Sequence, residues 1–253
     1  VFAFFIAQWF PWRICYFIGG GMGLLLLTLR MSVFESTLYK KLASKNHITK
    51  GNFLMLFNKK ERFMRYVRSI LIGLPTWFVV GILISFSPEF AYHLGIEQSI
   101  DPGKGIMISY AAIAVGDVAI GFLSNRLRSR KKALHIFYII TIAGMIVFFT
   151  ASTPWQLYLS TGIMGFGTGF WAVFVTIGAE NFGTNLRATA ATTIPNMVRG
   201  SLNIISAIFL FFSNQLSYVS GGIVTGVIVM LVTYWAIAGL QETFGRDLDF
   251  LEE

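Results

Sequence analysis

The sequence is poor in charge and nearly free of cysteine. Charged residues make up only 13% of its 253 residues, whereas a soluble domain carries about a quarter. The single cysteine, Cys15, excludes a disulfide framework and a cysteine metal site. Hydrophobic residues account for 55% of the chain. This composition predicts an integral membrane protein.

Signatures of catalysis are also missing. The histidines, His47, His93 and His135, fall in separate loops or helix ends, and no H-E-x-x-H, Cys/His cluster, G-x-S-x-G or phosphate-binding loop is present. We therefore expect no catalytic site, no metal and no cofactor, and a membrane enzyme is the least favoured class. A net charge of +8 would suggest nucleic acid binding in a soluble protein. Here the cations gather in loops between apolar segments, so we expect no nucleic acid partner.

What the sequence does contain is a series of apolar segments, each long enough to cross a bilayer. About 20 residues at a rise of about 1.5 Å each span the hydrocarbon core. The segments predict an all-α membrane bundle with seven complete spans, at 14–29, 68–91, 106–124, 133–151, 156–180, 188–212 and 219–240. Val1 stands inside a further apolar run, without an initiator Met or the parts of a signal peptide. We interpret residues 1–10 as the end of a preceding helix, and the chain as a fragment whose upstream part is missing.

The basic residues are confined to one side of these spans. The loops at 30–68, 125–132 and 181–187 and the tail after Leu240 hold seventeen of the twenty Lys and Arg. By the positive-inside rule, this side is cytoplasmic. We therefore predict a multi-pass protein of the plasma membrane (the cytoplasmic, or inner, membrane in a bacterium) with a cytoplasmic C-terminus.

The span 188–212 carries a charge near its middle. A charged side chain facing lipid costs several kcal/mol, so such residues nearly always face a cavity or a partner. The polar residues of this span recur every three or four positions, which places them on one stripe of a helix. They are Thr192, Asn196, Arg199, Asn203 and Ser206. The stripe predicts a substrate-binding surface centred on Arg199, and the alternative is that Arg199 pairs with a buried acid or carbonyl to hold helices together.

A motif stands at the end of the span 106–124. It reads Asp117-Val-Ala-Ile-Gly121-Phe-Leu-Ser-Asn125-Arg126-Leu-Arg128-Ser-Arg130-Lys131-Lys132. This segment resembles the D-x3-G-x3-D-R-x-G-R-R loop of the major facilitator superfamily, in the position between helices eight and nine. Asn125 replaces the usual acid and Arg128 the second glycine, so the copy is degenerate.

Three further segments carry the same resemblance. Glu35-Ser36 follows the first complete span, as in the sugar-porter and organic-ion branches. Residues 179–187 resemble the A-E-x-x-P-T-x-x-R turn between helices ten and eleven, with Gly183 in place of the proline. Residues 241–246 resemble the P-E-T-x-G-R tail, with Gln241 in place of the proline. The resemblance covers nearly the whole chain.

Membership in this superfamily implies helices six to twelve of a twelve-helix transporter, whose two halves rock around a central site. The implied parts are the end of helix five with helix six (1–29), a basic cytoplasmic loop (30–67), the C-terminal six-helix domain (68–240) and a cytoplasmic tail (241–253). The implied function is secondary active transport of a small organic solute by alternating access. Arg199 suggests an anionic solute.

The expected partners are the solute, the lipid bilayer and the N-terminal half of the same transporter, together with H+ under the hypothesis of proton symport. Two alternatives stay open. One is a drug or metabolite efflux antiporter, and the other is a non-transporting membrane receptor built on the same fold.

The resemblance also assigns gating or coupling roles on the cytoplasmic side. In one alternative, Asp117 instead carries a proton and is coupled to Arg199; in another, Glu180 and Arg187 are ordinary interfacial charges. The residues implicated are Asp117, Gly121, Arg126, Arg130, Glu180, Arg187, Glu242 and Arg246.

The middle of the span 156–180 is rich in glycine, and Trp171 follows these glycines within the same span. Small residues allow helices to approach closely, so packing is the default interpretation. The alternative is a flexible cavity-lining helix in which Trp171 stacks on an organic substrate. The glycines concerned are Gly162, Gly165, Gly167 and Gly169.

Overall fold

The computed structural model of the chain describes residues 1–31 and 51–252. These residues belong to two compact units, residues 1–48 and residues 49–253. The described residues form helices and no strands, and seven of the helices are long and apolar enough to cross a membrane. Glu35-Ser36 and much of the expected basic loop lie outside the described residues.

The first unit contains two helices. Helix α1 covers Phe2–Trp9 and α2 covers Trp12–Met31, with a break at the proline between them. No side chain of either helix is buried. Helix α2 matches the expected span at 14–29 and extends it at both ends.

The second unit begins with a short 3-10 turn, η1 (Phe53–Leu56), followed by a broken helix. That helix consists of α4 (Lys60–Leu71), α5 (Leu74–Phe78), the π-helical segment η2 (Val79–Ile84) and α6 (Ser87–His93). It starts at Lys60, whereas hydropathy predicted a start near residue 68. Helix α4 is amphipathic and basic, so its hydropathy is low, yet it buries Arg62, Tyr66 and Ser69 on one face.

Five further spans complete the second unit. Helix α7 covers Pro102–Leu127, α8 covers Arg130–Phe149 and α13 covers Tyr218–Ala238. The other two spans are each divided: α9 (Pro154–Thr168) continues as α10 (Trp171–Glu180), and α11 (Thr184–Gly200) continues as α12 (Leu202–Gln215). Side-chain oxygens of Asp101, Ser129 and Ser217 cap the starts of α7, α8 and α13.

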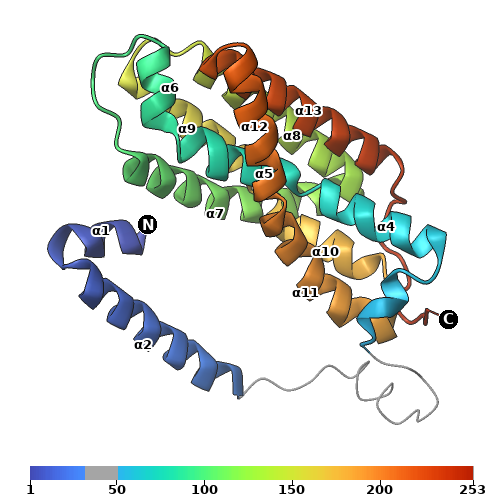
Figure 1. Cartoon of the computed structure of the whole chain (residues 1–253). Helices are drawn as coiled ribbons and strands as arrows, with labels where there is room; N and C mark the ends of the chain where they lie inside the picture. The colour runs from blue at the N-terminus through green and yellow to red at the C-terminus, as the bar shows by residue number, and fades with distance from the viewer. Residues whose placement is uncertain (32–50, 253) are drawn as a thin grey trace. The chain divides into compact units, whose positions relative to one another are not determined.

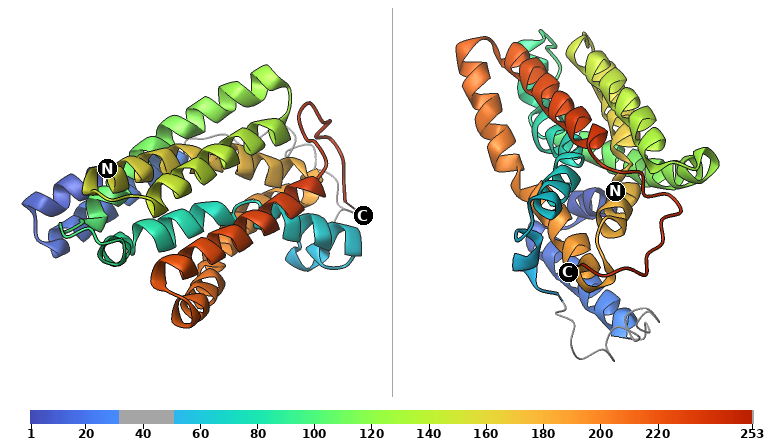
Figure 2. Two further views of the ribbon diagram at one scale, coloured as in Figure 1. Left: turned by 90° about the horizontal axis from the view of Figure 1, so that it is seen from above. Right: turned by 90° about the vertical axis from the view of Figure 1, so that its right-hand side faces the viewer.

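The family resemblance also implies that the six-helix domain consists of two three-helix repeats, the first opened by the span at 68–91 and the second by the span at 156–180. The helices of these two expected repeats pack in alternation (Figures 1 and 2). Helix α9, which opens the second repeat, packs mainly against α7 and α8 of the first. Conversely, α4 and α5, which open the first repeat, pack against α11 and α13 of the second, and α5 also meets α12. The first helix of each expected repeat therefore packs against helices of the other.

Glycines bring α7, α8 and α9 into near backbone contact. A Cβ on Gly116 of α7 would lie 2.4 Å from the carbonyl oxygen of Phe166, and one on Gly169 would lie 2.6 Å from the Cα of Gly116. A Cβ on Gly167 would lie 2.5 Å from the hydroxyl of Thr141 on α8. These distances leave no room for a side chain, so the packing interpretation of Gly167 and Gly169 accounts for both.

One end of the second unit, which we call the tail end, carries α4, the start of α11 and the C-terminal residues (Figure 1). The amide of Thr184 donates to the carbonyl of Phe250 at 2.8 Å, and the Asn185 side chain exchanges two 2.9 Å hydrogen bonds with the backbone of Glu252. The Glu252 carboxylate lies 3.1 Å from Arg62 and 3.0 Å from Arg65. The tail is thereby fixed to both α11 and α4.

Candidate functional site

A polar cavity of about 270 Å³, which we call the Arg199 cavity, lies among four of the spans of the second unit. Two of its lining residues are a carboxylate and a guanidinium, and three are large aromatic side chains. The lining comes from α5, η2, α7, α10 and α11 and comprises Thr76, Trp77, Val80, Tyr110, Ile113, Asp117, Trp171 and Arg199. Three residues predicted from sequence, Asp117, Trp171 and Arg199, are therefore brought to one site.

Asp117 belongs to α7, and its side chain reaches the N-terminus of α10. The helix formed by α9 and α10 breaks at Gly169 and Phe170, which leaves the first amides of α10 without partners in the helix. The Asp117 carboxylate accepts a 2.8 Å hydrogen bond from the amide of Ala172. Since a helix N-terminus carries partial positive charge, it stabilises this carboxylate inside the membrane. The close approach of Gly116 to Gly169 is what brings α7 near enough for the contact.

Arg199 is exposed on α11, close to its end. Its Nη1 donates to the side-chain oxygen of Asn196 at 2.9 Å, and the Asn196 amide nitrogen donates to the carbonyl of Thr192 at 2.9 Å. No acidic side chain within the described ranges forms an ion pair with it. The alternative in which Arg199 joins helices through a buried acid thus finds no partner in this part of the chain.

The predicted polar stripe is divided between two helices. Thr192, Asn196 and Arg199 lie on α11, which ends at Gly200, and Asn203 lies on α12. All four side chains are exposed in the second unit. Only Arg199 lines the cavity itself, and Asn196 reaches it through Arg199.

Three further side chains with polar groups line the Arg199 cavity, and of these sequence reasoning missed Thr76 and Tyr110. The hydroxyl of Thr76 and the indole nitrogen of Trp77 are buried and have no hydrogen-bond partner. Tyr110 is 46% exposed and stands about two turns before Asp117 on α7. The position of Thr76 and Trp77 directly after Pro75, where a helix is interrupted, was the available signal. Tyr110 had no such signal.

A second group of predicted residues meets at the tail end around Arg130. The Arg130 guanidinium lies 3.2 Å from the carboxylate of Glu180, and its backbone amide donates to Glu242 at 2.9 Å. Glu242 also accepts from the hydroxyl of Ser129 and from the amide of Lys131. Partial burial raises the pKa of Glu242, but the hydrogen bonds from Ser129 and from backbone amides outweigh it, so the net pKa is below its ordinary value. Glu242 therefore binds the start of α8 as a carboxylate.

The remaining predicted gating residues do not join the Arg130 group. Arg187 donates to the carbonyl of Leu248 in the tail, and Arg246 lies 4.8 Å over the ring of Phe250. Arg126 is exposed and forms no ion pair with any described residue. A Cβ on Gly121 would meet no atom within 4 Å. The structure thus gives Glu180, Arg130 and Glu242 a common cluster and leaves the others outside it.

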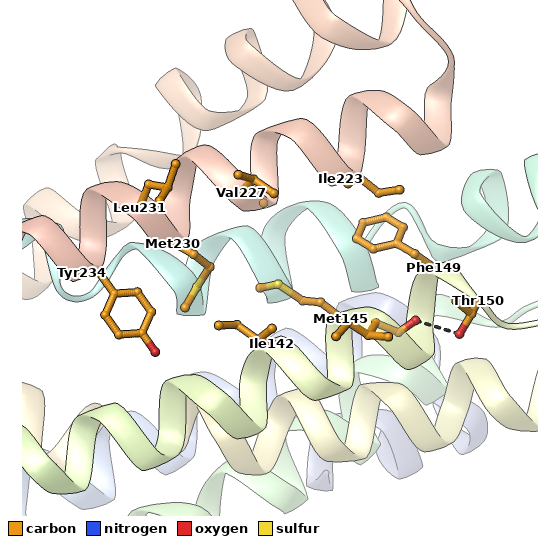
Figure 3. A pocket seen from close by; sticks show the side chains of 11 residues that line it. Ile142, Met145, Phe149, Thr150, Ile223, Val227, Met230, Leu231 and Tyr234 are labelled. Carbon is orange, nitrogen blue, oxygen red and sulfur yellow. Dashed lines mark hydrogen bonds between the residues drawn. The ribbon is translucent and has the colours of Figure 1, made fainter.

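A larger groove of about 430 Å³ lies between α8 and α13 and differs in character from the Arg199 cavity (Figure 3). Its lining is almost wholly apolar and includes Met145, Phe149 and Met230. The hydroxyl of Thr150 is occupied by a 2.8 Å hydrogen bond to the carbonyl of Ile146. Because it offers no charged group, this groove does not suit a polar or charged solute.

Comparison with known proteins agrees with this architecture. Residues 1–207 match the sequence profile of the Major Facilitator Superfamily. With most of its length matched, seven apolar helices and an all-helical bundle, the chain belongs to this family of multi-pass membrane transporters. It is similar to the choline/ethanolamine transporter FLVCR2 of Homo sapiens, at 26% identity over 210 residues. The match covers 78% of this chain and 38% of the relative, so the chain spans less than half of that protein's length.

Proposed function

We propose that the chain provides the C-terminal half of a secondary active transporter, and that the Arg199 cavity is its part of the solute site. The observation that carries the proposal is the convergence of Asp117, Arg199 and Trp171, from three different spans, on one cavity. Ionisable side chains within the membrane are costly and mark solute or ion pathways. A helix broken beside the site is likewise typical of transporters.

The favoured solute is a small organic anion. The Arg199 guanidinium presents a planar set of donors that suits a carboxylate or phosphate, and it has no acidic partner in the described residues. Its one side-chain hydrogen bond, to Asn196, holds it in place without neutralising it. The buried donors of Thr76 and Trp77 are available for further hydrogen bonds.

A cationic amine is the second candidate, and a specific observation supports it. Trp77, Tyr110 and Trp171 line the same cavity as the Asp117 carboxylate, and aromatic faces attract quaternary ammonium groups. The similar human protein is named a choline/ethanolamine transporter. In this alternative the Asp117 carboxylate is the main charge that attracts the solute, and Arg199 modifies the electrostatic potential of the site.

The remaining parts of the mechanism follow from the same layout. An N-terminal half provides the other surface of the site. The protein lies in the plasma membrane, and its tail end faces the cytoplasm. The Arg130, Glu180 and Glu242 cluster closes the cytoplasmic side in the outward-facing state. Proton coupling runs through Asp117, whose protonation removes the charge that the α10 N-terminus attracts and so weakens the link between α7 and α10. An efflux antiporter or a receptor would use the same cavity with a different direction or no turnover.

Uptake into proteoliposomes containing the intact transporter tests these proposals. Radiolabelled monocarboxylates and choline are compared with and without a pH gradient, for wild type, Arg199→Gln and Asp117→Asn. Lys132→Gln, an exposed cation of α8 outside the cavity, is the charge-matched control and should transport normally.

The outcomes separate the solute classes. If anion uptake falls about tenfold or more in Arg199→Gln, the solute is anionic, because this is the typical effect of losing a charge-assisted hydrogen bond. Loss of choline uptake in Asp117→Asn with little effect of Arg199→Gln supports the cationic alternative. Equal transport by both variants and wild type would remove the Arg199 cavity from the pathway, and uptake that ignores the pH gradient would remove proton symport.

A further inference from the structure

The tail end of the second unit contains a basic pocket of about 530 Å³ that the transport proposal does not use. Four parts of the chain surround it: α4, the turn after α10, the end of α13 and the C-terminal tail. Four of its lining side chains are cationic and one is acidic. The cationic side chains are Lys60, Arg65, Arg68 and Arg246, the acidic one is Glu61, and Asn181 lies among them.

Most of the positive charge in this basic pocket has no acidic partner. Only Arg65 is in an ion pair, at 3.0 Å from Glu252. Arg68 donates to a backbone carbonyl, that of Gly239, at 2.7 Å. Lys60 and Arg246 have no ion pair with any residue in the described ranges. An excess of like charge in one concave site attracts anions from solution.

The basic pocket also has polar atoms that lack partners. Asn181 is 1% exposed, and neither its amide nitrogen nor its amide oxygen forms a hydrogen bond. The Nε of Arg68 is buried and unpaired as well. Buried polar groups in native proteins are nearly always satisfied, so these atoms beside a charged pocket are available to hydrogen-bond a ligand. A ligand with several acceptor oxygens would satisfy the donors among them.

We propose that this basic pocket binds a phosphate-bearing anion. Guanidinium groups match the oxygens of phosphate in geometry and charge, and the pocket is lined by Arg68 of α4 and by Arg246 of the tail. The ligand would therefore link α4 to the tail and favour the conformation in which the tail is docked. The phosphate group comes either from a lipid headgroup of the adjacent leaflet, which is anionic on the cytoplasmic side, or from a soluble phosphate compound.

Thermal unfolding of the purified intact protein in detergent tests the proposal, and it needs no transport activity. The lipid probe is dioctanoyl phosphatidylinositol 4-phosphate, the soluble probe is inorganic pyrophosphate, and dioctanoyl phosphatidylcholine is the neutral control. The variants are Arg246→Gln, Lys60→Gln and the two combined. Lys132→Gln carries the same loss of charge at the same end, outside the basic pocket.

We expect a saturable rise in the unfolding midpoint that phosphatidylcholine does not produce. Affinity should fall about fivefold for each basic side chain removed, from the usual contribution of a cation near an anionic headgroup, and should stay within about twofold of wild type in Lys132→Gln. A response to the lipid alone assigns a headgroup site, and a response to both probes assigns a site for phosphate itself. No response to either probe, or equal affinities for Lys132→Gln and the double variant, refutes the proposal. If the double variant does not fold, Arg246→Gln alone decides, because the side chain lies in the tail outside the helices.

Discussion

The contact between Gly116 on α7 and the break after α9 leads to a quantitative prediction. A Cβ added at Gly116 would lie 2.4 Å from the carbonyl oxygen of Phe166 and 3.0 Å from the Cα of Gly169. Both neighbours are backbone, so they cannot rotate away, and overpacking of this kind costs about 1–3 kcal/mol. Gly116→Ala should therefore separate α7 from α9 and destabilise the domain.

Gly121 supplies the matched control, because it lies on the same helix and a Cβ there would meet nothing within 4 Å. Replacing glycine by alanine in a helix gains up to about 1 kcal/mol, and both variants share this gain. The free energy of unfolding of Gly116→Ala should thus be about 1–3 kcal/mol below that of Gly121→Ala. The common term cancels, so the difference reports the steric clash alone.

Unfolding of the purified protein in mixed micelles, with increasing SDS, measures both variants. Since Gly116 directly precedes Asp117, the same clash should pull the carboxylate away from the amide of Ala172. We therefore also expect weaker solute binding in Gly116→Ala than in Gly121→Ala. Equal stability of the two variants would refute the close α7–α9 contact, and with it the geometry of the Arg199 cavity.

Three further predictions concern the charged residues. In the wild type, the Glu242 carboxylate contributes stability above its ordinary pKa of 4.5, and this contribution is lost as the pH falls through the lowered pKa of the folded state. Glu242→Gln lacks this contribution, so the unfolding midpoints of the two proteins should converge between about pH 6 and about pH 3. Parallel curves would contradict this. The pair of Arg130 and Glu180, both partly exposed, should show a favourable coupling of about 0.5–1 kcal/mol in a double-mutant cycle of Gln variants, and a coupling of zero would leave Glu180 an ordinary interfacial charge. Asp117→Asn should retain the hydrogen bond to α10 through its amide oxygen, so it should unfold near wild type while changing solute uptake; a large loss of stability would make Asp117 chiefly a structural cap.

The apolar runs sufficed to predict the membrane spans, because burial in lipid demands about 20 apolar residues whatever the tertiary contacts. The start of the first span of the second unit was missed for the opposite reason. Helix α4 is too basic to register as apolar, and several of its cations are accommodated by distant partners: Glu252 for Arg62 and Arg65, and the carbonyl of Gly239 for Arg68. Partners so far away in sequence leave no local pattern.

The candidate site was predictable in part. The spacing of polar residues identified Arg199, and the motif at the end of α7 identified Asp117. The break at Gly169 and Phe170, which exposes the α10 amides to Asp117, depends on backbone contacts with α7 that no periodicity encodes. For the same reason the sequence offered no sign of Tyr110, which joins the lining only because α7 lies beside α5 and α10.

The central claim, that the Arg199 cavity lies on the path of the solute, is most directly tested by cysteine accessibility. The native cysteines of the intact transporter, Cys15 among them, are replaced by Ser, and one cysteine is introduced as Tyr110→Cys in the Arg199 cavity or as Ile146→Cys in the apolar groove. The account predicts that a charged, membrane-impermeant thiol reagent modifies Tyr110→Cys in proteoliposomes, that transported solute slows this reaction, and that Ile146→Cys does not react. Modification of Tyr110→Cys at a rate unaffected by solute, or no modification at all while uptake proceeds, would contradict it.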